Sequence, residues 1–195
     1  MLKILTVPNP TLRKKSKPVK VFDKKLGKFI GELNDALVNK QDPPGVGLSA
    51  IQVGKPWRIF STFLPKDSNE DRPKSSKRFL LTTFVNPTIV ANSKKLTLGP
   101  KPKDPILEGC LSIPGIYGPV KRHEWVKLKW QIADLPAQAG GKWHTDKFSG
   151  FTARVIQHEM NHLDGILFPD LTLKQKLPLY EERKGKLQRI ELTVA

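Results

Sequence analysis

VIQHEMNHLDG, residues 155–165, is the stretch that decides the fold, because its apolar and polar residues recur with the period of an α-helix. Extended to residues 151–164, this helix has two faces that are largely apolar. The first face carries Ala153, Ile156, Met160 and Leu163, and the second carries Phe151, Val155, His158 and His162. A helix that is apolar on two sides lies in the middle of its domain, so we predict that strands enclose it.

Two histidines on this helix have the spacing of a metal site. His158 and His162 are four residues apart, so their imidazoles lie one turn apart and can reach one ion at ~2.0–2.1 Å. Glu159 is rotated by ~100° from the first histidine and can instead accept a proton from a water molecule. The alternative is a chance match to H-E-x-x-H by two ordinary histidines on a buried helix.

The residues alone leave the third ligand open. No histidine follows His162, and Asp164 is turned about 160° away from the ligand face, where it is better placed to end the helix. The candidates are therefore upstream: Cys110, His123 and His144. Both histidines lie in polar segments, which predicts exposed side chains, whereas Cys110 lies on a tight loop without competing charge. A lone cysteine is otherwise a small buried apolar residue.

The other elements are predicted from periodicity and turn residues. The pattern predicts an amphipathic helix over residues 22–40, which the sequence QDPPG ends. We expect strands at 57–64, 79–85, 88–91 and 126–132, a hinge between two of them at Asn86-Pro87, and loops or turns at 66–77, 99–105 and 139–141. The tail 171–195, interrupted by Pro178 and Gly185, is expected to form short pieces on the body. The predicted fold class is α+β, with antiparallel strands and sheets around a central metal-binding helix, in a single catalytic domain over residues 1–195.

Composition limits the class of protein. The chain is 38% hydrophobic, and no apolar run is long enough to span a bilayer. The single cysteine excludes an internal disulfide and fits a reducing compartment, so we expect a cytoplasmic protein, and no cleavable signal is recognised. The net charge of +16 would draw the chain to polyanions such as the ribosome. The lysines are scattered and no RNA-binding signature occurs, which favours general surface charge over sequence-specific recognition of nucleic acid.

Three motifs resemble those of peptide deformylase, in the same order and at similar separations: GVGLSAIQ (45–52), EGCLS (108–112) and QHEMNHLDG (157–165). The segments VPNPTLR near the N-terminus and GIYGPVKR (115–122) fit the same family, so the resemblance covers roughly residues 1–170. Two positions depart from the pattern. Ser49 stands where a small apolar residue is usual, and Asn161 stands where an acidic residue is common. Neither position is a ligand or a catalytic group.

The resemblance implies a metal-dependent hydrolase of the bacterial type. It implies that Cys110, His158 and His162 bind one divalent metal ion, with iron(II) native and zinc, nickel or cobalt as alternatives. Glu159 would transfer the proton. The side-chain amide of Gln52 and the backbone N–H of Leu111 would donate hydrogen bonds to the formyl oxygen.

The resemblance also implies the substrate, which is the N-terminal formylmethionine of nascent polypeptides, with release of formate. Gly45 and Gly47 lack a Cβ and would let a peptide approach this loop as an added strand. A pocket that suits the unbranched methionine side chain would be lined by Val46, Ile106, Phe151 and Val155. Glu108 precedes the ligand loop and could pair with Arg122 outside the metal ligands.

The residues alone leave two other interpretations of the protein open. A zinc endopeptidase would need a third ligand other than Cys110. A basic protein that binds RNA or the ribosome would use its metal only to hold the fold, and it would unfold without the ion. If the chain acts on nascent peptides instead, its basic surface would serve association with the ribosome, which is a separate hypothesis.

Overall fold

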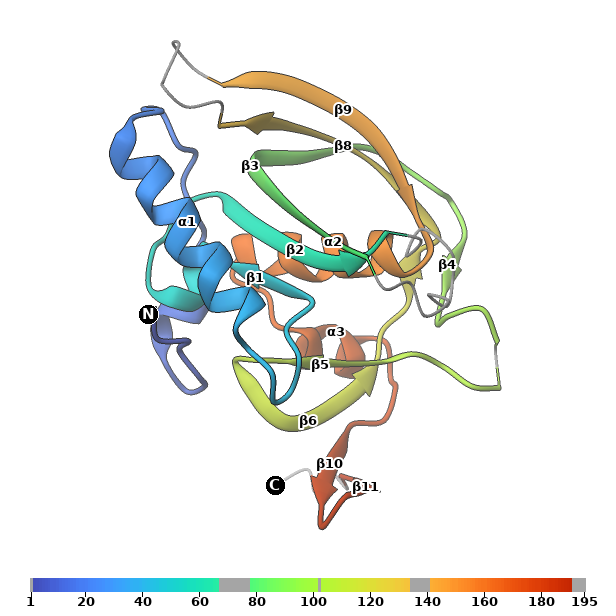
Figure 1. Cartoon of the computed structure of the whole chain (residues 1–195). Coiled ribbons are helices and arrows are strands. Elements are labelled where there is room, and N and C mark those ends of the chain that lie inside the picture. The colour runs from blue at the N-terminus through green and yellow to red at the C-terminus, as the bar shows by residue number, and fades with distance from the viewer. Residues whose placement is uncertain (1, 67–77, 102, 134–140, 191–195) are drawn as a thin grey trace.

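The computed structural model describes residues 2–66, 78–101, 103–133 and 141–190 of the chain. Nearly all of the predicted loop at 66–77 and most of the predicted turn at 139–141 lie outside the described residues. The strands form two larger antiparallel sheets and one short pair, and the helices pack against them (Figure 1). This arrangement confirms the predicted α+β class.

The strand order of the two larger sheets places β1 at the edge of one sheet and β5 at the edge of the other. The first sheet has the order β1-β2-β3-β8-β9, with bounds Gly47–Ser49, Ile59–Pro65, Phe79–Asn92, Trp125–Ile132 and Lys142–Ser149. The second sheet has the order β11-β10-β6-β5, with bounds Lys186–Arg189, Tyr180–Arg183, Ile113–Pro119 and Leu107–Cys110. The short pair consists of β4 (Leu96–Thr97) and β7 (Arg122–His123). Among the described strands, β1 and β5 are therefore each paired on one side only, and such an edge can accept a further strand.

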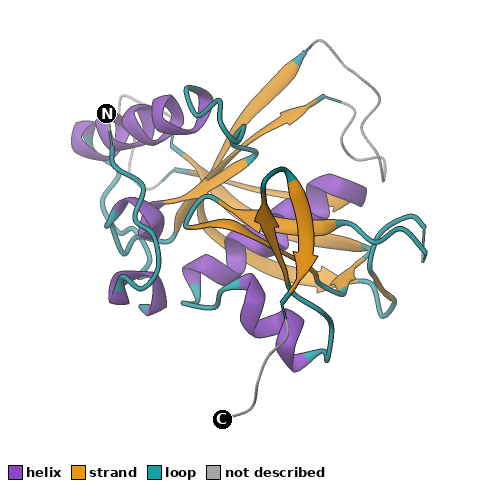
Figure 2. Cartoon of the chain, turned by 90° about the horizontal axis from the view of Figure 1, so that it is seen from below, coloured by secondary structure: helices purple, strands orange, loops and turns teal. Residues whose placement is uncertain are grey.

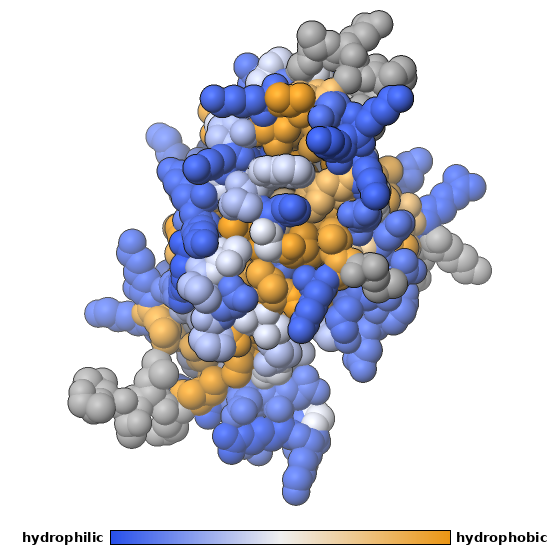
Figure 3. Space-filling view, turned by 90° about the vertical axis from the view of Figure 1, so that its left-hand side faces the viewer, coloured by the Kyte–Doolittle hydropathy of each residue, from blue (hydrophilic) through white to orange (hydrophobic). Residues whose placement is uncertain are grey.

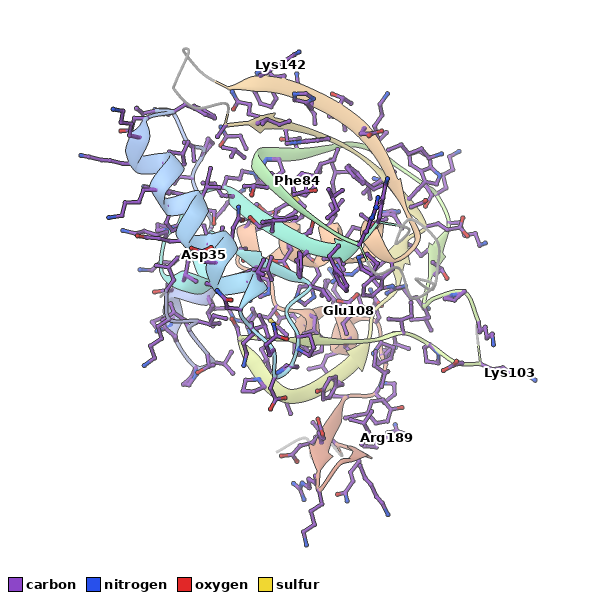
Figure 4. All side chains as sticks on the ribbon, viewed as in Figure 1. Asp35, Phe84, Lys103, Glu108, Lys142 and Arg189 are labelled. Atoms are coloured by element: carbon purple, nitrogen blue, oxygen red, sulfur yellow. The ribbon has the colours of Figure 1, made fainter. Side chains whose placement is uncertain are left out.

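The predicted central helix is α2, Gly150–Leu163. Its first face packs against the first sheet in one cluster of buried side chains: Ala153, Ile156, Met160 and Leu163 with Phe60, Phe84, Val126, Leu128 and Trp130. Phe84, labelled in Figure 4, lies in this core, where its ring stacks on that of Phe60 at 4.7 Å between centroids. The packing prediction for this face is confirmed. The helix ends where expected, at Asp164, whose carboxylate pairs with Arg58 at 2.9 Å.

The first long helix, α1, spans Lys24–Val38, slightly inside the predicted range. It begins where the side chain of Asp23 accepts a hydrogen bond of 2.9 Å from the backbone N–H of Leu26, which satisfies one free donor of the first turn. Its buried face, Leu26, Phe29, Leu33, Ala36 and Leu37, forms a second core cluster with Leu48 of β1 and Ile59 of β2. This packing fixes β1 and the loop before it beside α2.

The predicted hinge between two strands at Asn86-Pro87 is wrong, because β3 is one continuous strand. Its first half pairs with β2 and its second half with β8, and the pairing with β8 shifts register between Val85 and Thr88. Asn86 adopts φ 51°, which asparagine tolerates better than most residues, and its side chain exchanges hydrogen bonds of 2.7 and 2.8 Å with the backbone of Val19. A bulge thus accommodates the missing N–H of Pro87 without ending the strand.

The tail forms short packed pieces, as predicted. The helix α3 (Phe168–Lys174) is followed by the hairpin β10–β11, and β10 pairs with β6. Lys184 and Gly185 both have positive φ, 52° and 72°, which is the backbone of the tight turns that match the twist of a hairpin. Figure 2, the view from below, shows this hairpin in front of the rest of the chain.

Among the described residues, no helix has both the length and the apolar character that crossing a membrane requires.

Candidate metal centre

Three side chains from two elements meet at one point. Cys110 is the last residue of β5, and His158 and His162 come from the second face of α2. The sulfur of Cys110 lies 3.2 Å from Nε2 of His162, and one ligand atom from each of the three residues lies within 4.8 Å of the others. The Cys110 sulfur also accepts a 3.4 Å hydrogen bond from the backbone N–H of Ser112, which orients it inward.

Outside the three ligands, Glu108 holds the first imidazole. Oε2 of Glu108 lies 3.0 Å from Nδ1 of His158, which leaves Nε2 of that ring to face Cys110 and His162. Arg122 donates two hydrogen bonds to the same carboxylate, at 2.8 and 2.7 Å, and Arg154 donates one at 3.3 Å. The predicted pairing of Glu108 with Arg122 is therefore confirmed. Figure 4 labels Glu108, and its carboxylate is almost fully buried.

The charges around Glu108 outweigh the effect of burial on the pKa of its carboxyl group. Burial alone would raise the pKa of this carboxyl, but the guanidinium of Arg122 and the contact with His158 lower it well below its usual range. Glu108 is thus a carboxylate held by two buried arginines. Asn161, where the family commonly has an acidic residue, accepts a further hydrogen bond from Arg122. This neutral acceptor leaves Glu108 as the charged partner of Arg122.

The donor set fits a divalent metal ion. A thiolate and two imidazoles are the ligands that zinc and divalent iron, nickel and cobalt share, and a tetrahedral ion with bonds of ~2.0–2.3 Å needs ligand atoms about 3.3–3.6 Å apart. The 3.2 Å between the Cys110 sulfur and Nε2 of His162 is close to this range, and a fixed second nitrogen on His158 is typical of metal-binding histidines. His123 and His144 are not in this cluster.

His123 and His144 are both partly buried, so the prediction that they are exposed is wrong. Nδ1 of His123 lies 2.6 Å from the carbonyl of Ser93, and the ring of His144 packs at 5.9 Å from that of Trp130. Each ring has a local structural partner, and neither reaches the centre formed with Cys110.

Glu159 faces the same centre from another side of α2. It is 2% exposed, and its Oε2 has no hydrogen-bond partner among the described residues. Burial raises the pKa of this carboxyl to about 7, against the opposing influence of His158 and Arg122. A buried carboxylate with a free oxygen and a pKa near neutrality can accept and return a proton.

Gly47 has a structural role in addition to the predicted one. A Cβ on Gly47 would lie 2.5 Å from Oε1 of Glu159, closer than real atoms approach. The missing side chain therefore makes room for the carboxylate, whatever it does for a peptide. Gly45 does not line the cavity described below, because it is buried and faces Leu37, whose Cδ1 would lie 2.8 Å from an added Cβ.

We expect Gly47→Ala to lower the turnover number by about tenfold to a hundredfold, because a displacement of about 1 Å at a reacting group has effects of this size. Gly31→Ala is the matched control, since nothing lies within 4 Å of a Cβ at Gly31 in the middle of α1. The control should keep full activity and gain slightly in stability. Steady-state kinetics and thermal unfolding of both variants test this, and equal activities would contradict the contact with Glu159.

The amide of Gln52 is held in one orientation. Its Oε1 accepts hydrogen bonds from both the backbone N–H and the hydroxyl of Ser49, each at 2.8 Å. Its Nε2 consequently points toward Ser112, at 3.1 Å, and toward the sulfur of Cys110, at 3.6 Å. Ser49, which departs from the small apolar residue usual in the family, thus supplies a second donor that fixes this amide.

A cavity of about 660 Å³ opens onto the cluster. The lining includes the predicted Val46, Gly47, Gln52, Ile106, Leu111, Phe151 and Val155, together with Cys110, His158 and Glu159. It also includes Asp42, Tyr117 and Glu182, which the sequence did not indicate. Tyr117 lies within the segment GIYGPVKR, but the place of Glu182 depends on how the tail hairpin docks, which no local pattern predicts.

Comparisons with known proteins agree on one family. The family model described as polypeptide deformylase matches residues 1–177. The peptide deformylase of Brucella suis is 38% identical over 184 residues, which is 94% of this chain and 91% of that protein. The structure of the Thermotoga maritima enzyme matches with a TM-score of 0.69 and 30% identity over 88% of this chain and 97% of that chain. A Met-Ala-Ser-bound peptide deformylase of Acinetobacter baumannii matches with a TM-score of 0.69 and 28% identity over 88% and 98%.

Proposed function

This chain belongs to the peptide deformylase family, and from that premise we propose that Cys110, His158 and His162 hold a divalent metal ion with which the protein hydrolyses N-terminal formyl groups and releases formate. Enzymes of this family remove the formyl group from peptides that begin with methionine. The family is metal-dependent, and the three side chains form a group that could hold such an ion. The observation that carries the proposal is the approach of the Cys110 sulfur to Nε2 of His162, at 3.2 Å.

Each side chain around the centre has a role that its contacts support. The ion, when bound, would supply Lewis-acid activation of water and of the formyl carbonyl. Glu159 takes the proton of the attacking water on its free oxygen and returns it to the departing amine. The amide of Gln52, oriented by Ser49, and the backbone N–H of Leu111 donate hydrogen bonds to the oxygen on which negative charge develops.

The cavity suits a peptide with an apolar first side chain. Gly47 of β1 and the whole of β5 line it, so a peptide in the cavity lies between the free edges of two sheets and can pair with them. Val46, Ile106, Phe151 and Val155 supply an apolar surface for methionine. The Met-Ala-Ser peptide bound by the Acinetobacter baumannii relative is of the class that we propose here. We also propose that residues 1–195 act as one catalytic domain, since Glu182 of the tail borders the same cavity as His158.

The proposal is tested by measuring formate from formyl-Met-Ala-Ser, with protein purified anaerobically and its metal content determined in parallel. We expect formate in proportion to the bound metal, with iron(II) as the most active ion, and no cleavage of acetylated or unformylated peptides. A chelator should abolish turnover while the chain stays folded, and Cys110→Ser should lose both metal and turnover. Cleavage of internal peptide bonds, or full activity of Cys110→Ser, would contradict the assignment.

Association with the ribosome is a further part of the proposal. The net charge is +16, and hydrophilic side chains project around the margin of the face shown in Figure 3. An enzyme that acts on nascent peptides works beside ribosomal RNA, where this charge would concentrate it. Cosedimentation with ribosomes should therefore be strong at low salt and weak at high salt; no binding at low salt would leave the charge without this role.

A further inference from the structure

The tail hairpin contributes a wall to the cavity. The family model matches residues 1–177, and β10 and β11 lie after that range. β10 extends the second sheet by pairing with β6, where Tyr180 lies opposite Tyr117 and Glu181 opposite Ile116. This register brings Glu182, the next residue of β10, to the cavity lining.

A short series of contacts connects Glu182 to the metal centre. Tyr117 lies opposite Gly109, the residue before Cys110, and a Cβ on Gly109 would lie 2.8 Å from Cε1 of the tyrosine ring. The ring of Tyr117 therefore covers β5 next to the ligand cysteine. Its hydroxyl donates a 3.1 Å hydrogen bond to Oε2 of Glu182. Glu182 is thus separated from the strand that carries Cys110 by one tyrosine side chain.

A second carboxylate faces the same part of the cavity. Asp42 is also in the lining, and its charge, with that of Glu182, adds to burial in raising the pKa of the Tyr117 hydroxyl. Within the described part of the chain, neither Asp42 nor Glu182 forms an ion pair. Lys40 also lines the cavity, but its ammonium group donates to the backbone carbonyl of Asp42. Two exposed carboxylates that form no ion pair among the described residues therefore line this cavity in a strongly basic protein.

The geometry points to an acidic rim, made by Glu182 and Asp42, that binds a basic side chain in the first few residues after the formylmethionine. This inference rests on the proposed function, because it names which peptides the same cavity favours. The ammonium or guanidinium group would lie beside the Tyr117 hydroxyl, near the carboxylate that this hydroxyl already orients. Since Glu182 is exposed to solvent, we expect a preference of about three- to fivefold, within the range of exposed ion pairs.

The test compares kcat/KM for formyl-Met-Lys-Ser and formyl-Met-Ala-Lys with the same peptides carrying glutamine in place of lysine. The wild-type chain should prefer lysine in at least one position, and high salt should remove the preference. Glu182→Gln should reduce the preference, the double variant with Asp42→Asn should abolish it, and Glu182→Lys should reverse it in favour of glutamine. For each variant, both rates are expressed relative to the rate with formyl-Met-Ala-Ser, so that a general change in turnover is not counted as a change in preference.

Glu181→Gln is the matched control, because Glu181 is in the same strand but pairs with Arg183 at 2.7 Å and does not line the cavity. This variant should keep the wild-type preference. Equal rates for the lysine and glutamine peptides, or a preference that survives the double variant, would overturn the inference. Failure to hydrolyse any formyl peptide would instead contradict the proposed function. In that case, calorimetry would compare the affinities of Met-Lys-Ser and Met-Gln-Ser, and tighter binding of Met-Lys-Ser would support the acidic rim without any hydrolysis.

Discussion

Replacing Glu159 with glutamine should lower kcat for formyl-Met-Ala-Ser by about 10²- to 10⁴-fold, the range that a positioned acid or base supplies. Glutamine has the same shape but cannot accept the proton. The carboxylate is 2% exposed, its Oε2 has no described hydrogen-bond partner and burial raises its pKa to about 7, so little charge stabilisation is lost on replacement. The folded stability and the metal content should therefore remain close to those of the wild-type chain.

The measurements are single-turnover kinetics, metal analysis and thermal unfolding. Glu32→Gln is a suitable control, because this glutamate lies on the surface of α1 and only approaches Lys28, at 4.0 Å. It should change none of the three. If Glu159→Gln retained full turnover with normal metal content, another group would have to move the proton, and the role given to Glu159 would be wrong.

Replacing Glu108 with glutamine should have the largest effect on stability, because this carboxylate is shared by two buried arginines and one histidine. The variant leaves the guanidinium groups of Arg122 and Arg154 in the interior without the negative charge they share. Removing one partner of a buried ion pair typically costs about 3–5 kcal/mol. The hydrogen bond that fixes His158 is also weakened, so metal affinity should fall by about 10- to 100-fold.

Urea unfolding and competition with a metal indicator measure these two effects. Glu124→Gln is the control, because Glu124 pairs with Lys95 at 2.7 Å on the surface, where such a pair contributes at most about 1 kcal/mol. We expect the control to differ little from the wild-type chain in either measurement. A Glu108→Gln variant as stable as the control would show that Arg122 and Arg154 do not depend on this charge.

The elements that could be predicted from the sequence are those whose signal is local. The two faces of α2 follow from spacing within a single helix, and the structure packs the first face in the core as expected. The alternating strand Trp125–Ile132 and the helix α1 follow in the same way. Cys110 was different, since nothing in the spacing of one cysteine in a distant segment brings it to a helix. The residues alone left it as one of three upstream candidates, and only the resemblance of three motifs to one family selected it.

The features that were missed depend on contacts between distant segments. The sequence suggests close approach of a substrate at Gly47, but it does not show that the Glu159 carboxylate fills the place of a Cβ there. Asn86-Pro87 looked like a break, because the bonds from Asn86 to Val19 that stabilise the bulge join residues far apart in the chain. Glu182 had no signal at all, since its position follows from the pairing of β10 with β6.

The sharing of α2 between the core and the metal cluster restricts how this protein can change over evolutionary time. A substitution beneath Ile156 or Met160 that tilts the helix also moves the imidazoles on its other side, because the interior is close-packed and transmits strain. Substitutions should therefore be accepted less often in the sheet that packs against α2 than in segments such as the β10–β11 hairpin. New peptide preferences can arise there while the chemistry is inherited intact.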